Sequence, residues 1–328
     1  MKTFRKIMTY ALLAGILSFL IVPLVIPETS SGTLTNVEAA GANAEFESLA
    51  GVSVHVEREI YQGGCECQAP LIVLMHGFGA STFSWRDVIE PLSAFGDVIA
   101  YDRPGFGFTE RPIIWGEVNP YGFEGNFQIL DDLITKFGSD REVVLVGHSA
   151  GGQLAAEYAR LNPSKVKSLV LVDPAILTTG GGPNGFEWLY EIPQIKKLGP
   201  ILVSSIATSG MDLLKESYFD QNQLTAEVLV GYQAPLKVKG WEVGFWNFAT
   251  APRQNKLSEN LDDLKLPTLL ITGSNDTVVP TSDTVKLDTL ISNSELEIIQ
   301  QSAHLPQEEK PQEFMAAIAK HWSALVSK

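Results

Sequence analysis

The segment VLVGHSAGGQLAAEYA, residues 144–159, changes its hydrophobic pattern near its centre. It begins with β-branched and apolar residues, which is typical of a strand buried on both faces, and continues as an amphipathic helix. Ser149 stands between the two parts and is flanked by Gly147 and Gly151. Small residues let the backbone turn sharply from a strand into a helix. The segment therefore predicts a serine presented on a strand–turn–helix junction, which is the geometry of a nucleophile elbow.

Two backbone donors are expected to stabilise the oxyanion that forms when the Ser149 hydroxyl attacks a carbonyl. The first is the N–H of Ala150, at the start of the predicted helix, where free N–H groups and the helix dipole favour negative charge. The second is the N–H of Phe78, in the turn HGFG that follows the apolar run LIVLM. In that turn Gly77 lets the backbone approach a substrate closely, and His76 is expected to orient the turn.

A serine hydroxyl also needs a general base, and the chain contains five histidines. His304 follows the last apolar strand, where the carboxyl edge of a parallel sheet would place it beside Ser149. This position predicts His304 as the base. His76 and His148 adjoin glycine turns and are expected to orient them. His55 and His321 are expected to be solvated or to lie at the edge of the core.

Two aspartates compete as the partner that orients His304 and stabilises its charged form. Asp276 ends a strand in the stretch LLITGSNDTVVP, and Asp173 ends the preceding strand in LVLVDPA. Both lie where parallel strands finish, at the edge of the sheet that holds the sites of open α/β proteins. The chain order Ser149, Asp276, His304 is the order found in hydrolases with a nucleophile elbow. This order favours Asp276 and leaves Asp173 as a capping or supporting residue.

Short apolar runs alternate with helical patterns along the rest of the chain. Five nearly continuous runs predict strands covered on both faces, and SVHVERE at residues 53–59 alternates like an antiparallel strand. Residues 124–137 and 311–325 place apolar side chains along one helical stripe. The alternation predicts an α/β protein with a mostly parallel sheet and helices on both faces. The five runs are LIVLM, DVIAY, EVVLV, SLVLV and TLLIT.

The alternation lapses over residues 175–262. This segment is rich in aromatic residues, contains no convincing buried strand, and is too long for a structureless loop inside a compact domain. We expect it to form a mostly helical cap over the sheet. The α/β core then comprises residues 45–174 and 263–328.

The N-terminal segment has the composition of a membrane anchor. Residues 7–26 carry no charge, and a helix of this length spans about 30 Å, the thickness of a bilayer core. Basic residues precede it and acidic residues follow, which predicts a cytoplasmic N-terminus and a catalytic domain on the extracytoplasmic side. A cleaved signal peptide is the alternative and would give a secreted protein, although this apolar run is longer than a usual signal. We therefore expect an anchor at residues 1–26 and a small, polar tether at residues 27–44.

The overall composition limits the ligands. With 45% hydrophobic and 19% charged residues the chain is globular, and its net charge of −14 argues against nucleic acid, which needs clustered Lys and Arg. Cys65 and Cys67 are too few for a zinc site and predict a surface turn with two thiols or a local disulfide. No metal, cofactor or protein partner is predicted. The expected partners are a small apolar ester-like substrate and the lipid bilayer.

Six motifs, taken in chain order, resemble the α/β-hydrolase family. The resemblance implies an eight-stranded, mostly parallel sheet with a helical cap, and it supports the triad and oxyanion roles assigned above. The motif DRPGFG, which begins at Asp102, is similar to the version in dehalogenases, epoxide hydrolases and carbon–carbon bond hydrolases, and Asp102 is expected to be a supporting residue of the site. The first two use an aspartate nucleophile, whereas this chain has Ser149, which disfavours halide displacement and epoxide opening. The six motifs are HGFGAS, YDRPGFGFTERP, GHSAGG, LVDPA, GSNDTVVP and SAHLPQEEKP.

These observations lead us to expect a membrane-tethered serine hydrolase that cleaves an ester or similar acyl bond of an apolar small molecule. A carbon–carbon bond hydrolase and a cofactor-free perhydrolase or haloperoxidase have closely similar triads, so the sequence leaves both open. A ligand-binding receptor with little turnover is the alternative from another class, and the intact triad argues against it.

Overall fold

The continuous apolar runs of the sequence form the central strands of one eight-stranded sheet in the computed structural model. These strands are buried on both faces, which explains why they lack the alternation of a half-exposed strand. The structure describes residues 2–27, 30–64, 69–138, 140–177, 187–204, 206–252 and 256–327. Cys65 and Cys67, for which the sequence predicts a surface turn, lie outside the described residues.

The sheet has the strand order β1-β2-β4-β3-β5-β6-β7-β8. Strand β2 pairs antiparallel with β1 and β4, and all other neighbours pair in parallel. The predicted mostly parallel, eight-stranded sheet is therefore confirmed. The strands are β1 Glu45–Leu49, β2 Val52–Glu59, β3 Leu71–Met75, β4 Asp97–Tyr101, β5 Val143–His148, β6 Ser168–Val172, β7 Thr268–Gly273 and β8 Ser294–Ile299.

The order of connection reverses at β3, because β4 lies on one side of this strand and β5 on the other. In open α/β sheets the crevice at such a reversal, beyond the carboxyl ends of the strands, is where ligands bind. Met75 pairs with Gly147 near the ends of β3 and β5, so the loops that follow these two strands begin side by side.

Helices cover both faces of the sheet, because successive side chains of a strand point to opposite sides. Leu71 packs with α4 and α5 on one face, and Ile72 packs with α3 and α13 on the other. The helices of the core are α3 Ile89–Leu92, α4 Phe123–Leu133, α5 Ala150–Leu161, α11 Thr281–Leu290, α12 Pro306–Glu309 and α13 Pro311–Val326.

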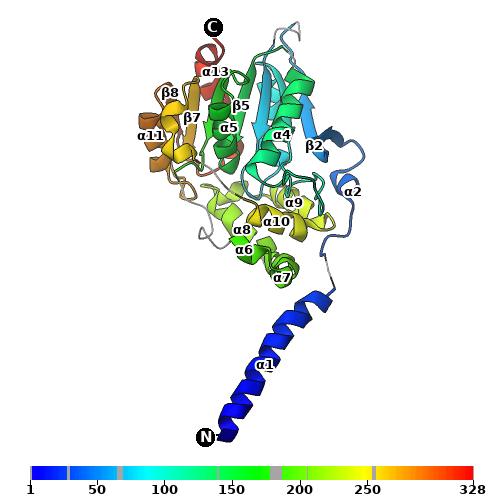
Figure 1. Cartoon of the computed structure of the whole chain (residues 1–328). Coiled ribbons are helices and arrows are strands. Elements are labelled where there is room, and N and C mark those ends of the chain that lie inside the picture. Colours follow the sequence, from blue (N-terminus) through cyan, green and yellow to red (C-terminus); the bar gives the residue numbers. More distant parts are fainter. Residues whose placement is uncertain are drawn as a thin grey trace.

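Among the described residues between β6 and β7, five helices lie in the segment for which the sequence predicts a helical cap, and they cover the carboxyl edge of the sheet (Figure 1). We call them the cap helices. They pack through two apolar clusters, one around Phe245 and Trp241 and one around Leu214 and Val228. The cap helices are α6 Glu187–Tyr190, α7 Pro193–Val203, α8 Ile206–Glu216, α9 Ala226–Gln233 and α10 Trp241–Thr250.

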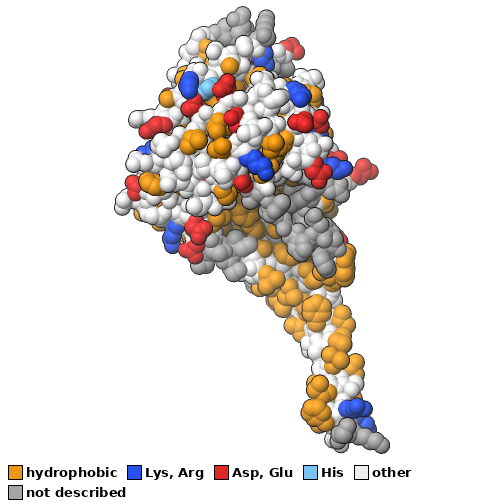
Figure 2. All heavy atoms as spheres, turned by 90° about the vertical axis from the view of Figure 1, so that its left-hand side faces the viewer, with side chains coloured by type: hydrophobic (Ala, Val, Ile, Leu, Met, Phe, Trp, Pro, Cys, Tyr) orange, Lys and Arg blue, Asp and Glu red, His pale blue; other side chains and the backbone are white. Residues whose placement is uncertain are grey.

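Helix α1 (Lys2–Val25) projects from the cap side of the body, and most of its apolar side chains are exposed (Figures 1 and 2). Within Thr3–Val25 an 18-residue window has a mean hydropathy of 2.2, and the helix is long and apolar enough to cross a membrane, a criterion that a signal sequence also meets. The Gln194 side chain donates a hydrogen bond to the Leu20 carbonyl at 3.0 Å, so the last turns of α1 contact α7.

The segment after α1, predicted as a tether, is bound to the cap rather than free. Glu242 is only 4% exposed, and its carboxylate accepts hydrogen bonds from the Ser30 hydroxyl (2.7 Å) and from the Ser31 N–H (2.7 Å) and hydroxyl (2.8 Å). Leu34 then forms a parallel bridge with Val238, ahead of the short helix α2 (Asn36–Ala40). Small polar residues suit a flexible tether, but their donors equally satisfy a buried carboxylate, so composition alone does not distinguish the two.

Candidate active site

Ser149 occupies a strained turn between β5 and α5. Its φ of 52° and ψ of −118° lie in a region that non-glycine residues rarely adopt. The Ser149 N–H donates to the Val172 carbonyl at 2.9 Å, which fixes the turn to the end of β6. A Cβ atom at Gly151 would lie 2.2 Å from the Met75 carbonyl oxygen, so only glycine lets the elbow pass this close to β3. The surrounding backbone thus holds the serine in the strained conformation.

His304 and Asp276 lie side by side at the carboxyl edge of the sheet. The Nδ1–H of His304 donates to Asp276 Oδ2 at 2.7 Å, and both side chains are buried. Asp276 Oδ1 accepts the N–H groups of Val278 (2.8 Å) and Val279 (3.1 Å), which hold the carboxylate in its orientation toward His304. The carboxylate places the proton on Nδ1, leaving Nε2 of His304 as the acceptor that a general base needs.

Ser149 and His304 line one cavity, with a volume of about 200 Å³, between the sheet edge and the cap. Its walls are mainly apolar, and Phe78 contributes a ring that is 42% exposed and contacts Phe106 and Phe245. A site of this kind accepts apolar groups and excludes much of the water. Further lining residues from the cap segment are Met211, Leu213, Leu214, Tyr232, Leu236 and Trp241.

The loop after β3 presents the Phe78 N–H on the side away from the Gly77 carbonyl, because N–H and C=O point in opposite directions across a trans peptide. The Gly77 oxygen accepts hydrogen bonds from His76 Nδ1 (2.7 Å) and from the Arg103 guanidinium (3.1 Å). Burial lowers the pKa of His76 to about 3, and the nearby Arg103 charge acts in the same direction, so His76 is neutral. A Cβ at Gly77 would lie 3.2 Å from Ser149 Cβ, which shows how closely this loop approaches the serine.

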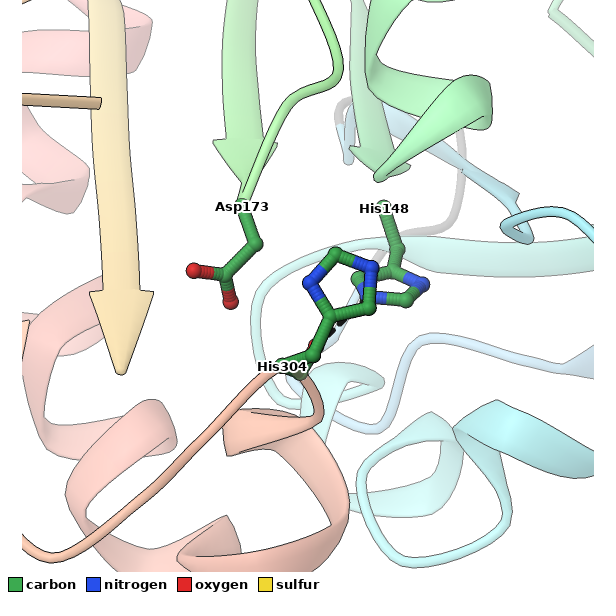
Figure 3. Close-up of side chains that lie close together, drawn as sticks. All are labelled: His148, Asp173 and His304. Atoms are coloured by element: carbon green, nitrogen blue, oxygen red, sulfur yellow. Dashed lines mark hydrogen bonds between the residues drawn. The ribbon is translucent and has the colours of Figure 1, made fainter. Parts of the chain in front are cut away.

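His148 lies behind His304 and is not placed as a base. Its Nε2 donates to the His304 carbonyl at 2.7 Å, and the two rings are 4.7 Å apart between centroids (Figure 3). Burial and the neighbouring His304 hold the pKa of His148 well below its ordinary value. A neutral ring fastened to the His304 backbone fits the orienting role predicted for it.

Asp173, the competing acid, follows the last residue of β6 and makes no hydrogen bond to His304 in the described structure. Its Oδ1 accepts the Thr272 hydroxyl at 2.6 Å. Asp173, His148 and His304 each offer a possible metal-ligand atom, and these atoms lie within 4.8 Å of one another (Figure 3). A metal there would take a nitrogen of His304, whose Nδ1 already bonds Asp276 and whose Nε2 is the candidate proton acceptor. The donor set therefore suits proton transfer better than metal binding, and a metal-free site stays a prediction.

Asp102, predicted as a supporting residue, clamps three segments together. Its Oδ1 accepts the Thr82 N–H (2.7 Å), and its Oδ2 accepts the Phe108 N–H (2.7 Å) and His55 Nδ1 (2.9 Å). The sequence pattern assigned His55 no such role, but it is 4% exposed and pairs with a fully buried carboxylate. This clamp holds the loop that carries Phe78 against β2 and the segment after β4.

The His55–Asp102 pair predicts a pH-dependent stability. Burial lowers the pKa of His55, but the hydrogen bond and charge of Asp102 outweigh burial and raise it above its ordinary value. Burial raises the pKa of Asp102, but His55 and the Phe108 N–H outweigh it and lower the pKa. The stability from charged His55 is therefore complete below about pH 6.5 and is lost as the pH rises through the raised pKa.

We expect His55→Gln to lower the free energy of unfolding more at pH 5.5 than at pH 9. At the acidic end Asp102 keeps its charge down to its lowered pKa, so both members of the pair are ionised at pH 5.5. Denaturant midpoints of the two proteins across this range measure the difference. A difference that stays constant with pH would contradict the ion pair.

Two glutamates that the sequence analysis did not single out fasten the His304 loop to the cap. Glu309 accepts the Ala303 N–H (2.6 Å) with one oxygen and the Phe219 N–H (2.6 Å) with the other. The His304 N–H donates to the Ser217 carbonyl at 3.0 Å. The candidate base is therefore held by the same cap segment that lines the cavity.

Glu308 forms the second connection between the His304 loop and the cap segment. Its carboxylate accepts the hydroxyls of Tyr218 and Tyr232, each at 2.5 Å, and pairs with Arg86 at 2.6 Å. The sequence signal that could have indicated this network is the pair of consecutive acids, Glu308 and Glu309, shortly after His304. Their partners lie too far away in the chain to be inferred from that signal.

The comparisons with known proteins agree with this architecture. Residues 70–311 match the sequence model of the α/β-hydrolase fold. A 2-hydroxy-6-oxo-2,4-heptadienoate hydrolase of Pseudomonas putida is 28% identical over 290 residues, covering 82% of this chain and 97% of that protein. A monoacylglycerol lipase of Homo sapiens is 27% identical over 248 residues, covering 74% of this chain and 72% of that protein. Among solved structures, a membrane phospholipase A described as a bacterial virulence factor matches all of both chains with a TM-score of 0.66 and 23% identity.

Proposed function

The chain belongs to the α/β-hydrolase family and is a hydrolase, and from this premise we propose that it cleaves an ester or similar acyl bond of an apolar small molecule. Ser149 is the proposed nucleophile, His304 the general base and Asp276 the residue that orients it. The observation that carries the proposal is the 2.7 Å hydrogen bond between His304 and Asp276, with His304 and Ser149 lining the same apolar cavity.

The proposed reaction has two halves. The Ser149 hydroxyl oxygen attacks the substrate carbonyl while Nε2 of His304 takes its proton, and the N–H groups of Phe78 and Ala150 stabilise the oxyanion. His304 returns the proton to the leaving alcohol, which departs and leaves an acyl group on Ser149. Water then attacks this acyl group with His304 again as the base, which releases the acid and restores the serine.

Membrane tethering through α1 is part of the proposal. Thr3–Val25 has the length and hydropathy of a membrane span, and the basic residues Arg5 and Lys6 favour a cytoplasmic N-terminus with the catalytic domain on the other side. The exposed apolar surface of this helix supports an anchor (Figure 2). A cleaved signal segment is the alternative.

Carbon–carbon bond cleavage is the second candidate function. The relative in Pseudomonas putida, which this chain matches over 97% of that protein's length, is named a hydrolase of a hydroxy-oxo-dienoate. Such a reaction uses the same triad but needs a substrate whose breaking bond lies next to a carbonyl. The apolar cavity and the absence of a predicted cofactor suit both reactions.

A substrate panel separates these candidates. We expect kcat/KM for p-nitrophenyl esters to rise about fourfold for each added methylene until the apolar cavity is filled, because each buried methylene contributes about 0.8 kcal/mol. Vinylogous diketones, and peroxide with acetate, complete the panel. Faster turnover of a diketone than of every ester would favour carbon–carbon bond cleavage, and faster peroxide chemistry would favour a perhydrolase.

A further inference from the structure

Asp173 is a fully buried acid with one oxygen left unsatisfied. Its Oδ1 accepts the Thr272 hydroxyl (2.6 Å) and the Gly273 N–H (3.2 Å). Its Oδ2 is buried and receives no hydrogen-bond donor from the described part of the chain. The backbone at Asp173 has a φ of 42°, a strained value for a residue other than glycine, and its side chain lies near the ring of His304 (Figure 3). An ionised carboxylate in this position would carry an uncompensated buried charge.

The neighbour of Asp173 is the carboxyl of Asp276, which lies within hydrogen-bond reach. Two ionised carboxylates in contact, both shielded from water, repel each other strongly, so the pair holds one negative charge. The donors decide which acid is charged. Asp276 accepts three hydrogen bonds, from His304 and from the N–H groups of Val278 and Val279, so it carries the charge.

We propose that Asp173 is a neutral acid that donates its Oδ2 proton to Asp276 and acts as a reserve acid for His304. The proposal rests on the proposed triad, in which His304 needs a negative partner. In the native protein Asp173 is a positioning residue that acts through Asp276. If the charge of Asp276 is removed, Asp173 releases its proton to solvent and becomes the negative group nearest to His304.

The surroundings of Asp173 support both parts of this role. Burial raises the pKa of Asp173 well above its usual range, and the charge of Asp276 acts in the same direction. The hydrogen bond with Asp276 also raises this pKa, so replacing Asp276 by alanine removes two of the three causes and leaves burial. A possible ligand oxygen of Asp173 lies within 4.8 Å of a His304 ring nitrogen, close enough for its charge to stabilise the imidazolium. The ionisable groups that face Asp173 among the described residues are Asp276, His304 and His148.

A double-mutant cycle in the full chain tests the reserve role, with kcat/KM for one ester measured from pH 5 to 9. We expect Asp173→Asn to stay within about threefold of the native protein, because the amide still donates to Asp276. We expect Asp276→Ala to lose about 10²-fold and the double variant Asp276→Ala with Asp173→Asn about 10⁴-fold, the loss expected when no acid remains. Asp276→Ala with Asp262→Asn is the matched control, since Asp262 is an exposed acid, and it should equal Asp276→Ala.

The pH profile adds a readout that a packing role would not move. Asp276→Ala should show a new acid limb from the ionisation of Asp173, and the double variant should lack it. Equal activities of Asp276→Ala and the double variant, or a loss in Asp173→Asn as large as in Asp276→Ala, would overturn the reserve role.

Infrared spectroscopy tests the proton independently of turnover. The native protein and Ser149→Ala should both show the carbonyl band of a buried protonated carboxyl at pH 7, and Asp173→Asn should lack it. If Asp173→Asn does not fold, the native band and its persistence at pH 9 still decide the protonation state. An absent band overturns the proposal even in an active enzyme, whereas a band in a protein without esterase activity would contradict the proposed function alone.

Discussion

Ser149→Ala is expected to abolish ester hydrolysis, with a loss in kcat/KM of about 10⁴-fold or more. The alanine has no oxygen to attack the carbonyl, and no other hydroxyl is placed by an elbow beside His304 in the described structure. The two backbone donors and the cavity remain, so the variant should still bind substrate. A fluorophosphonate probe, which reacts with an activated serine, should label the native protein and leave Ser149→Ala unlabelled.

Ser204→Ala provides the matched control for this substitution. Its hydroxyl is exposed and donates only to the Ile201 carbonyl in the same helix, so activity and labelling should stay at the native level. Hydrolysis retained in Ser149→Ala would falsify the nucleophile assignment. A native protein that binds a small ligand tightly but is not labelled by the probe would instead favour the receptor function.

Removing α1 is expected to move the protein from the membrane fraction to the soluble fraction almost completely. A helix of about 20 apolar residues inserts into a bilayer in an effectively irreversible way, so the full chain should stay in the pellet after a high-salt wash. The truncated chain should begin at residue 27. This start keeps Ser30 and Ser31, whose donors satisfy the buried carboxylate of Glu242.

A start at residue 45 is the informative comparison, because it removes those donors as well as the helix. That chain should also be soluble but less stable to denaturant than the chain from residue 27, since a buried carboxylate without donors costs about 1–3 kcal/mol or more. Mass spectrometry of the mature full-length protein completes the test. A native protein that lacks α1 after export would show a cleaved signal and would exclude the anchor.

Much of the core could be predicted because burial on both faces leaves an unbroken apolar run. LIVLM and DVIAY coincide with β3 and β4, and the helical stripe at residues 311–325 lies within α13. The strand–turn–helix pattern around Ser149 was equally visible, since strand, glycines and helix are neighbours in the chain. These features depend on local periodicity, which a sequence displays directly.

Other parts of the site could not be predicted because their partners are distant in the chain. Ser31 and Glu242 are 211 positions apart, and His55 pairs with Asp102 across 47 positions. A polar residue looks the same in a sequence whether it is exposed to solvent, caps a helix or is buried beside a charged partner. Only the packing of separate segments brings donor and acceptor within 3 Å.

The sequence by itself determined the α/β architecture, the elbow that carries Ser149 and the chain order of the three candidate residues, because these follow from local patterns. The tertiary structure decided which acid reaches His304, and it placed Asp173 against Asp276 with no donor to its Oδ2 from the described residues. It also decided that the segment after α1 is bound to the cap. The physical reason is common to all three: hydrogen bonding and charge sharing depend on distances between the ends of different strands and loops, and folding alone sets those distances.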